Sequence, residues 1–417
     1  MWDPNKFLLS LVKMSLKNDV SDIHINPKED YVLIRFRKAQ DLIPFFKITK
    51  SDHEKLANII KNKWDISDQS DGPNHPKTGK INLEIPLKKK TLKVNLRVST
   101  LDSLYGDNIV MRVLLEDKSR LNIDNLGFID QNIRKIKKIK KLNSWLILTS
   151  GQTGAGKTTT LYSMLQMFDP QKKSIYTLED PIEFQIDGYI QSQIDWTLSS
   201  EQFQQTFTKW IKGILKQDPN IIMVWEIKEK ESASVCLEAA NTGHIVMGSI
   251  HANDGISVIS RLNQLGVESY LISAGLKYII HQKIVRKLCP ECHETINAQD
   301  HEYLAGDIDA VDKKIGTQTG LDNILDERAT WYDMWSVNHD GCEKCSKWYK
   351  WLTIVAEIVK VDDTISQMIF ENKSIRDIQN YLDESVNYIS MYENAILKSR
   401  HGLIDFREAL KIKEGNG

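Results

Sequence analysis

The chain has 417 residues, of which 41% are hydrophobic and 27% charged, and its formal net charge is −1. This length and composition predict roughly two to four domains with apolar cores, and the near-neutral charge offers no electrostatic case for a nucleic-acid coat protein. No apolar run approaches the roughly 18 residues of a membrane span, and charges interrupt the N-terminal stretch too often for a signal peptide. A cytoplasmic protein is therefore expected. Five cysteines are too few for a disulfide framework in a chain of this length.

Residues 1–118 are predicted to form an α+β domain. A helical start is followed by segments of strand-like composition. These segments are 31–37, 81–85 and 92–99. No phosphate loop lies in this region, so we expect it to have another task.

Residues 119–143 are predicted to be a linker with a basic amphipathic helix. Apolar residues recur at helical spacing from Ile129 to Leu142, with lysines and an arginine between them. A nucleic-acid patch is one interpretation, but a solvated helix face with an apolar stripe fits the pattern better.

A complete phosphate loop of the form G-x-x-x-x-G-K-[ST] occupies residues 151–158. It follows an apolar run, 146–148, and precedes a helix-like stretch, which is the context that the motif requires and which argues against a chance glycine-rich turn. Backbone N–H groups of such a loop surround a phosphate, and the helix N-terminus adds partial positive charge. Lys157 is expected to reach the β and γ phosphates of ATP, and the Thr158 hydroxyl to hold Mg²⁺. The predicted nucleotide-binding residues are Gly151, Gln152, Thr153, Gly154, Ala155, Gly156, Lys157, Thr158 and Thr159.

Apolar strands alternate with amphipathic helices in residues 144–286. This alternation predicts an α/β domain, a parallel sheet with helices on its faces. The candidate strands are 145–150, 174–180, 221–227 and 244–251. Aromatic and apolar side chains on one stripe of 201–217 indicate a packed helix.

Carboxylates follow two of these strands. Glu179, Asp180 and Glu183 come after one strand, and Glu226 ends an apolar strand of Walker B form. Carboxylates at the carboxyl ends of parallel strands lie beside the nucleotide crevice, where one of them can orient and deprotonate a water. Each acid alone is more often a helix cap or a surface charge, but their order after a phosphate loop favours catalysis.

Two histidines, His244 and His251, lie seven residues apart around the next strand. A lone histidine beside a strand is usually structural. After a Walker B-like acid, both are candidates to hydrogen-bond the γ-phosphate.

Five motifs in family order resemble the secretion ATPase family that powers type II secretion and type IV pilus assembly. They are GQTGAGKTTTLY, TLEDPIEF, KQDPNIIMV, SIHANDG and HQKIVRKLCPEC. The resemblance runs from about Ser21 to the C-terminus and includes VSDIHINP and LRVST in the first domain. It implies a RecA-like P-loop NTPase core and a PAS-like N-terminal α+β domain.

The resemblance also implies roles for single residues. Glu183 is similar to the family's water-activating glutamate, and Glu226 to its Walker B glutamate. Glu179 falls in the family's acidic box, and His244 and His251 fall in its histidine box. The first domain's Arg97 and Arg112 match arginines that close on the phosphates and neutralise developing charge.

The resemblance also implies an oligomeric state, a location and a partner for the chain, as a motor. A hexamer is expected at the cytoplasmic face of the inner membrane, peripherally associated through the platform protein of a pilus or secretion apparatus, without stable nucleic-acid binding. The resemblance does not decide whether the motor drives pilin assembly, DNA uptake or protein secretion. Many members carry a further N-terminal docking domain, which this sequence lacks, so docking is expected to differ or to use a segment outside it.

Two C-x2-C pairs, separated by 49 residues, lie in 287–352. Cys289, Cys292, Cys342 and Cys345 supply the four thiolates of a structural, tetrahedral Zn²⁺ site. A redox C-x-x-C is the competing interpretation, but the second pair favours zinc. The resemblance supports zinc, because assembly-type members carry such an insert. The remaining residues, 353–417, are predicted to be helical.

Tryptophan repeatedly stands where the family has glycine. Clear cases are Trp145, Trp225, Trp348 and Trp351, and Trp196 and Trp210 are further candidates. Genuine tryptophans beside the Walker B acid threaten activity and favour a catalytically silent ring component. The second hypothesis is a UGA codon that is read as glycine in the native host, because chance scatters substitutions over many residue types. A nucleic-acid translocase is a third possibility, disfavoured by the neutral charge.

Overall fold

The computed structural model divides into two compact units, Met1–Lys118 and Ser119–Gly417. Within the described part of the chain, no helix combines the length and apolar composition that a membrane crossing requires. The structure describes residues 2–18, 20–38, 41–63, 65–66, 77–86, 91–115, 121–194, 200–298, 302–315, 333–338, 340–343, 345 and 349–415.

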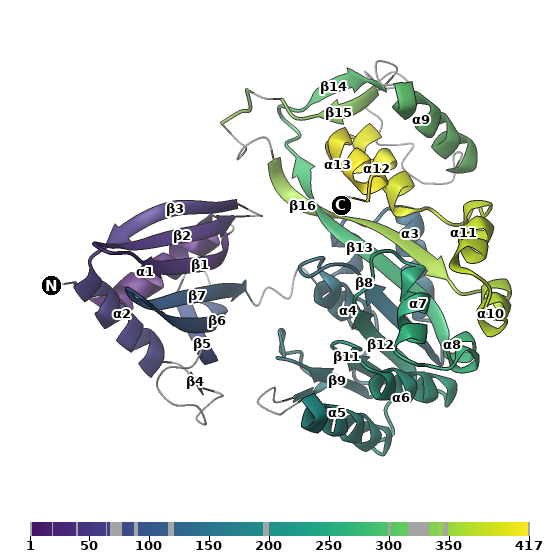
Figure 1. Cartoon of the computed structure of the whole chain (residues 1–417), viewed down its shortest axis with the longest axis horizontal. Helices are drawn as coiled ribbons and strands as arrows, with labels where there is room; N and C mark the ends of the chain where they lie inside the picture. Colours follow the sequence, from purple (N-terminus) through teal and green to yellow (C-terminus); the bar gives the residue numbers. More distant parts are fainter. Residues whose placement is uncertain are drawn as a thin grey trace. The chain divides into compact units, whose positions relative to one another are not determined.

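The first unit is an antiparallel sheet with two helices, α1 (Pro4–Lys17) and α2 (Lys50–Asn62), as Figure 1 shows. Across the sheet the strands are β3 (Asp41–Ile48), β2 (Val32–Lys38), β1 (Val20–Pro27), β7 (Gly106–Leu115), β6 (Thr91–Ser103), β5 (Lys77–Pro86) and β4 (Asp65–Ile66). Both helices present an apolar face to the sheet: Leu11 and Leu56 pack in one core with Ile23 of β1. The predicted α+β character and the three predicted strand segments are confirmed.

The second unit is built on a seven-stranded sheet. Six strands are parallel, and the edge strand β16 is antiparallel to its neighbour. Across the sheet the strands are β10 (Ile190–Gln193), β9 (Ile175–Glu179), β11 (Ile221–Val224), β12 (Ile245–Ile250), β8 (Trp145–Ser150), β13 (Leu276–Leu288) and β16 (Tyr349–Lys360). Strands β11, β12, β8 and β13 are therefore direct neighbours, and their carboxyl ends share one edge of the sheet.

Helices cover both faces of this sheet, which explains why its strands are apolar on both sides. On one face lie α5 (Ser200–Leu215), α6 (Lys230–Asn241), α7 (Ser257–Gln264), α8 (Ser269–Gly275), α10 (Asp363–Phe370) and α11 (Ile375–Asp383). On the other lie a 3-10 helix (Ile123–Asn125), α3 (Asp130–Ile139) and α4 (Lys157–Leu165). Helix α3 buries Ile136 and Ile139 completely, so the predicted amphipathic helix with an apolar stripe is confirmed.

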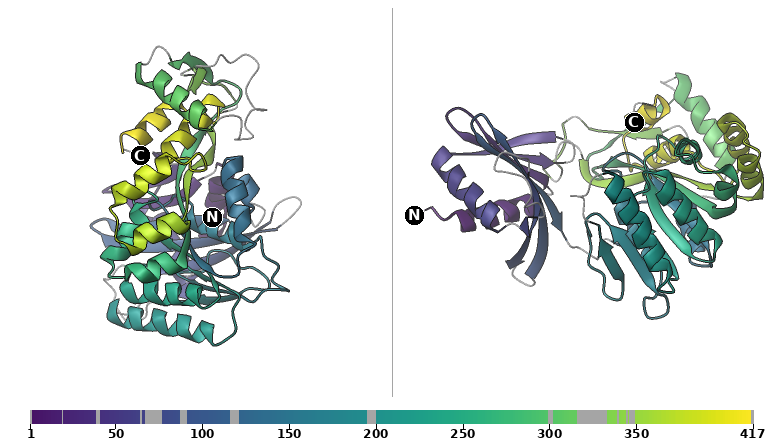
Figure 2. Two further views of the ribbon diagram at one scale, coloured as in Figure 1. Left: turned by 90° about the vertical axis from the view of Figure 1, so that its right-hand side faces the viewer. Right: turned by 60° about the horizontal axis from the view of Figure 1, so that its bottom comes forward.

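Strands β13 and β16 extend as a two-stranded ribbon that carries the cysteine-bearing insert. Their pairing continues from Tyr278↔Lys360 to Leu288↔Tyr349. The insert contains β14 (Glu294–Asn297), α9 (Glu302–Ile315) and β15 (Asp333–Ser336). The C-terminal helices α12 (Met391–Arg400) and α13 (Phe406–Lys413) pack with it in a separate core. In Figure 2 (left) these yellow helices lie alongside the green ribbon.

The four predicted core strands are confirmed as β8, β9, β11 and β12. The ribbon is not among the predicted elements, and residues 353–360, predicted to be helical, form the last two thirds of β16. The run Thr353–Val359 is almost continuously apolar, so periodicity cannot distinguish a buried strand from a buried helix there. The helices predicted after Val361 are present. Helix α12 begins at a capping box formed by Ser390 and Glu393.

Candidate active site and metal centre

The phosphate loop leaves the carboxyl end of β8 and leads into α4. Gly156 has φ 82° and is the residue from which α4 starts. Gly151 has φ 141°, and a Cβ there would lie 2.3 Å from the carbonyl oxygen of Gln282. Only glycine accommodates both the conformation and the close approach. The tip of the loop, Gln152–Gly154, is exposed, so its backbone N–H groups are accessible to a phosphate.

Lys157, His251 and Glu226 form a connected chain of side chains at this edge of the sheet. Lys157 Nζ donates to the carbonyls of Gly151 at 2.7 Å and Gln152 at 3.3 Å. It also lies 3.4 Å from His251 Nδ1, and His251 Nε2 lies 2.8 Å from Glu226 Oε1. Burial lowers the pKa of Lys157, and Glu226 opposes that shift.

Glu226 lies between His251 and Lys228. Its side chain is 7% exposed, and Lys228 Nζ lies 3.1 Å from its second oxygen. Strand order explains the meeting, because β12 lies between β11, which precedes Glu226, and β8, which precedes the loop. Residues far apart in sequence therefore converge on the phosphate position.

Glu179 is fully buried at the end of β9 and accepts several hydrogen bonds. Thr177 Oγ1 donates to it at 2.6 Å, Gln191 Nε2 at 3.2 Å, and Tyr162 through its hydroxyl. The backbone N–H of Glu183 also donates to this carboxylate, and burial raises the pKa of Glu179 despite these bonds. The structure therefore places Glu179 as an anchor for the loop that carries Glu183, which is half-buried.

His244 lies at the other end of β12 from His251. It precedes the first residue of the strand, and its Nδ1 lies 3.0 Å from the carbonyl of Ala239. A strand rises about 3.3 Å per residue, so the two histidines are roughly 20 Å apart. Within this chain the structure brings His251, and not His244, to the phosphate loop.

Gln282 on β13 is a site residue that the sequence analysis does not identify. It is 1% exposed, its Nε2 donates to the Ala155 carbonyl at 2.6 Å, and its Oε1 accepts from Thr160 at 2.8 Å. These bonds fix the phosphate loop to the neighbouring strand. A glutamine between the apolar pairs Ile279–Ile280 and Ile284–Val285 was the signal available in the sequence, since a buried amide requires partners.

Arg97 and Arg112 belong to the first unit. They are directly opposite each other on β6 and β7, so their side chains share the face of the sheet away from α1 and α2. Arg112 Nε donates to Asp22 at 2.9 Å, and both arginines are exposed.

Trp145 has a backbone conformation that side chains rarely adopt. It opens β8 with φ 117°, a value at which glycine is the residue normally found. The other described non-glycine residues with positive φ, Asp218 and Asn372, have values of 51° and 55°, where such residues are tolerated. The backbone at 145 therefore supports a glycine at this position.

The other tryptophans give no such signal. Trp225 and Trp351 are not among the described residues with positive φ. The Trp225 N–H donates to Leu178, and Trp225 lines a small cavity with Asp180 and Glu226. The Trp225 indole therefore lies next to Glu226, and Glu226 keeps its contact with His251. Trp348 and Trp196 lie outside the described residues.

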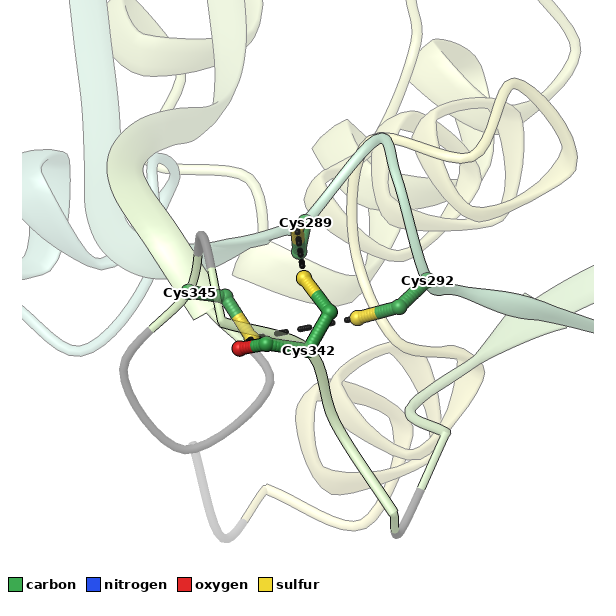
Figure 3. A group of neighbouring side chains, drawn as sticks. All are labelled: Cys289, Cys292, Cys342 and Cys345. Carbon is green, nitrogen blue, oxygen red and sulfur yellow. Dashed lines mark hydrogen bonds between the residues drawn. The ribbon is translucent and has the colours of Figure 1, made fainter.

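The four cysteines of the insert converge at the end of the ribbon. Cys289 follows β13 directly and Cys345 lies shortly before β16, so strand pairing brings the two C-x2-C turns together. Figure 3 shows the four side chains facing one another. The sulfurs of Cys289 and Cys342, and those of Cys292 and Cys345, are each 3.8 Å apart. All four sulfurs lie within 4.8 Å of one another.

This arrangement fits zinc. A tetrahedral ion with Zn–S bonds of about 2.3 Å places its ligand sulfurs about 3.8 Å apart. The imidazole of His293 donates from Nδ1 to the Cys289 carbonyl at 2.7 Å and packs edge-on against Trp335, which orders the first knuckle. Four thiolates leave no open position for substrate, so the centre is structural in type.

Curated proteins of known function are similar to the chain over nearly its whole length. The type II secretion system ATPase E of Vibrio cholerae serotype O1 is 31% identical over 410 residues, covering 98% of this chain and 75% of that protein. The type IV pilus assembly ATPase PilB of Thermus thermophilus is 30% identical over 406 residues, covering 97% of this chain and 42% of that protein.

Solved structures share the fold. The Legionella pneumophila ATPase DotB superposes with a TM-score of 0.68 at 17% identity, covering 99% of this chain and 96% of that chain. The pilus retraction motor PilT with bound ADP gives a TM-score of 0.58 at 20% identity, covering 97% and 96%. The family model described as Type II/IV secretion system protein matches residues 5–411. The chain thus belongs to the type II/IV secretion system protein family and is an ATPase of that family.

Proposed function

We propose that this ATPase is a hexameric motor that drives type IV pilus assembly or type II protein secretion from the cytoplasmic face of the inner membrane. The observation that carries the proposal is the convergence of the phosphate loop, Glu226 and His251 at one edge of the sheet. The named relatives act in one or the other apparatus, so the proposal covers both.

The loop residues, Gly151 through Thr159, hold the triphosphate. In the structure the Lys157 ammonium bonds the loop's own carbonyls, and the β and γ phosphates replace these acceptors when ATP binds. The Thr158 hydroxyl would hold Mg²⁺ together with the phosphates, and the ion would supply further charge neutralisation. The main task of such a site is to stabilise the charge that develops on the transferred phosphoryl group.

Water activation belongs to the carboxylates. Glu183 takes the role of general base, and Glu179 positions it through the hydrogen bond that it accepts from the Glu183 N–H. Glu226 and His251 lie where the γ-phosphate is expected. The contact between Glu226 and His251 fits an imidazole that donates from Nε2 and accepts from Lys157 at Nδ1.

Arg97 and Arg112 take the role of neutralising the charge that develops on the transferred phosphoryl group. Replacement of either arginine by alanine should lower turnover far more than Arg35→Ala, which removes an arginine bonded to Asn26 on the same sheet. Equal turnover in all three variants would remove the arginines from the mechanism.

The proposed partners are other copies of this chain and the inner-membrane platform protein, with no stable nucleic-acid complex. The cysteine-bearing insert and the C-terminal helices pack together in a core of their own. Sedimentation of the ATP-bound Glu226→Gln variant should show a six-copy particle, and a monomer under those conditions would contradict the hexamer.

The nucleotide site is tested by Lys157→Ala. Loss of the phosphate-facing ammonium should abolish Mg²⁺-dependent ATP hydrolysis. Lys172→Ala is the matched control, because its side chain is 81% exposed and pairs with Asp169 outside the loop. Hydrolysis at the same rate in both variants would show that the site is elsewhere.

A catalytically silent ring component is the second candidate, and Trp225 beside Glu226 is the feature that favours it. Such a protein binds ATP without turnover. Tight ATP binding together with no phosphate release in single-turnover experiments would select this alternative.

A further inference from the structure

A row of buried polar residues crosses three strands beside the phosphate loop. Ser150 on β8 is in register with His281 on β13, which is in register with Glu357 on β16. The three are 0%, 5% and 6% exposed, and Ser150 Oγ lies 3.0 Å from His281 Nδ1. Residues in register share a face of the sheet, so the row leads from the last residue before Gly151 to the edge strand.

The Glu357 carboxylate at the end of this row joins two distant segments. Its Oε1 accepts from the backbone N–H of Gly255 at 2.6 Å. Its Oε2 accepts from the Tyr388 hydroxyl at 2.9 Å and from the backbone N–H of Met391 at 3.1 Å. A buried carboxylate is tolerated only with such partners.

The first of these segments belongs to the candidate active site. Gly255 comes four residues after His251, at the end of the loop that follows β12 and before α7. A Cβ on Gly255 would lie 2.8 Å from Glu357 Oε1, so backbone and carboxylate are in close contact there.

The second segment starts the C-terminal helices. Met391 is the first residue of α12. Helix α12 is fastened to α9 of the insert by two ion pairs, Lys314–Glu393 at 2.9 Å and Arg400–Asp312. Movement at the start of α12 is therefore shared with the cysteine-bearing insert.

We propose that Glu357 is a positioning residue that clamps the His251 loop to the start of α12, so that a change in this loop on ATP binding is passed to the C-terminal helices and the insert. This inference rests on the proposed role of His251 at the nucleotide. One carboxylate thus connects the nucleotide site to the C-terminal helices. The groups that donate hydrogen bonds to it lie in two segments about 130 residues apart in the chain.

A measurement of the coupling between the His251 loop and the start of α12 distinguishes the proposed role of Glu357 from a purely stabilising one. Hydrogen–deuterium exchange of the full chain is compared with and without a non-hydrolysable ATP analogue, at peptides covering 251–256 and 388–394. In the unmodified protein, analogue binding should change protection in both peptides. In Tyr388→Phe and Glu357→Gln the change at 251–256 should persist, whereas the change at 388–394 should shrink at least several-fold.

Kinetics give the second readout. Both variants should lower kcat about tenfold or more while the Kd for ATP stays within about threefold, because the phosphate contacts are untouched. The matched control is Tyr381→Phe, which removes a phenol hydroxyl bonded to Asp362 in the same helical region without touching Glu357. It should match the unmodified protein in both readouts.

Tyr388→Phe keeps the experiment decisive if Glu357→Gln does not fold, since it removes one hydroxyl and keeps the ring. Lower thermal stability with coupled exchange and kcat both retained would overturn the proposal. Failure of the nucleotide site itself is separate, because it would show as no analogue-induced protection at the phosphate loop in the unmodified protein.

Discussion

His251 Nε2 lies 2.8 Å from Glu226 Oε1, across the ends of two neighbouring strands. The same imidazole faces Lys157 through its other nitrogen, at 3.4 Å. A single neutral tautomer satisfies both contacts, accepting from the lysine and donating to the carboxylate. The histidine therefore links Lys157, the group expected to hold the γ-phosphate, with Glu226.

Removing this link should slow turnover and spare binding. His251→Ala is expected to lower kcat by about 10²-fold, because it removes the imidazole that contacts both Lys157 and Glu226, with the Kd for ATP within about threefold. Glu226→Gln should retain nucleotide with little turnover. The neighbouring exposed Asn253→Ala is the control and should behave as the unmodified protein. An unchanged kcat in His251→Ala, measured by phosphate release, would contradict the assignment.

Elemental analysis should find about one zinc per chain. Cys342→Ser should lower the zinc content and the stability of the insert, because a tetrahedral site with one weak ligand loses much of its affinity. The ATP Kd should be retained, since the cysteines lie at the far end of the ribbon from the phosphate loop. Cys236→Ala, at a buried cysteine outside the cluster, is the control and should keep its zinc. Folded, metal-free protein with four titratable thiols would rule out the centre.

Trp145→Gly should stabilise the protein. The present backbone conformation costs a side-chain-bearing residue about 1–3 kcal/mol, which exceeds the roughly 0.5–1 kcal/mol of the contact between the ring and Lys277 Nζ, 4.5 Å from its centroid. Thermal unfolding should therefore shift upward by a few degrees. Trp351→Gly, at a residue without positive φ, is the control and should show no such gain.

The recoding hypothesis is tested on the same position by mass. A peptide covering residue 145, isolated from the native host, should carry glycine. Tryptophan in that peptide, together with equal stability of the two versions, would leave the tryptophan genuine and favour the silent ring component.

Acid should destabilise the protein through His281. Burial lowers the pKa of this imidazole to about 4, with Asp254 opposing and Lys157 reinforcing the shift. The unfolded chain binds this proton near pH 6.5, so it holds more protons than the folded state between about pH 6.5 and 4. Stability is therefore complete above this window and falls as the pH falls, by about 2 kcal/mol between pH 7 and 5. Urea unfolding at the two pH values measures it.

The matched variant for this test is His281→Asn. It keeps a polar group that can bond Ser150 but cannot take up a proton in this range. The pH 7 to 5 difference in unfolding free energy should shrink by about the same 2 kcal/mol. An undiminished difference would assign the acid sensitivity to other groups.

The sequence by itself determined the features that depend on consecutive residues. The phosphate loop, the acid that ends β11 and the two C-x2-C turns are local, because their geometry follows from neighbouring backbone conformations. Alternating apolar strands and amphipathic helices likewise predicted the parallel sheet and its four central strands.

Only the tertiary structure decided which of these features meet. The order β11, β12, β8, β13 places His251 at the phosphate loop and leaves His244 a strand's length away, although the two are seven residues apart. The ribbon of β13 and β16 closes the cysteine pairs and brings Glu357 to Gly255. Strand order and register are set by packing among residues far apart in the chain. The sequence of a strand that is apolar on both faces does not indicate its position in the sheet or its register.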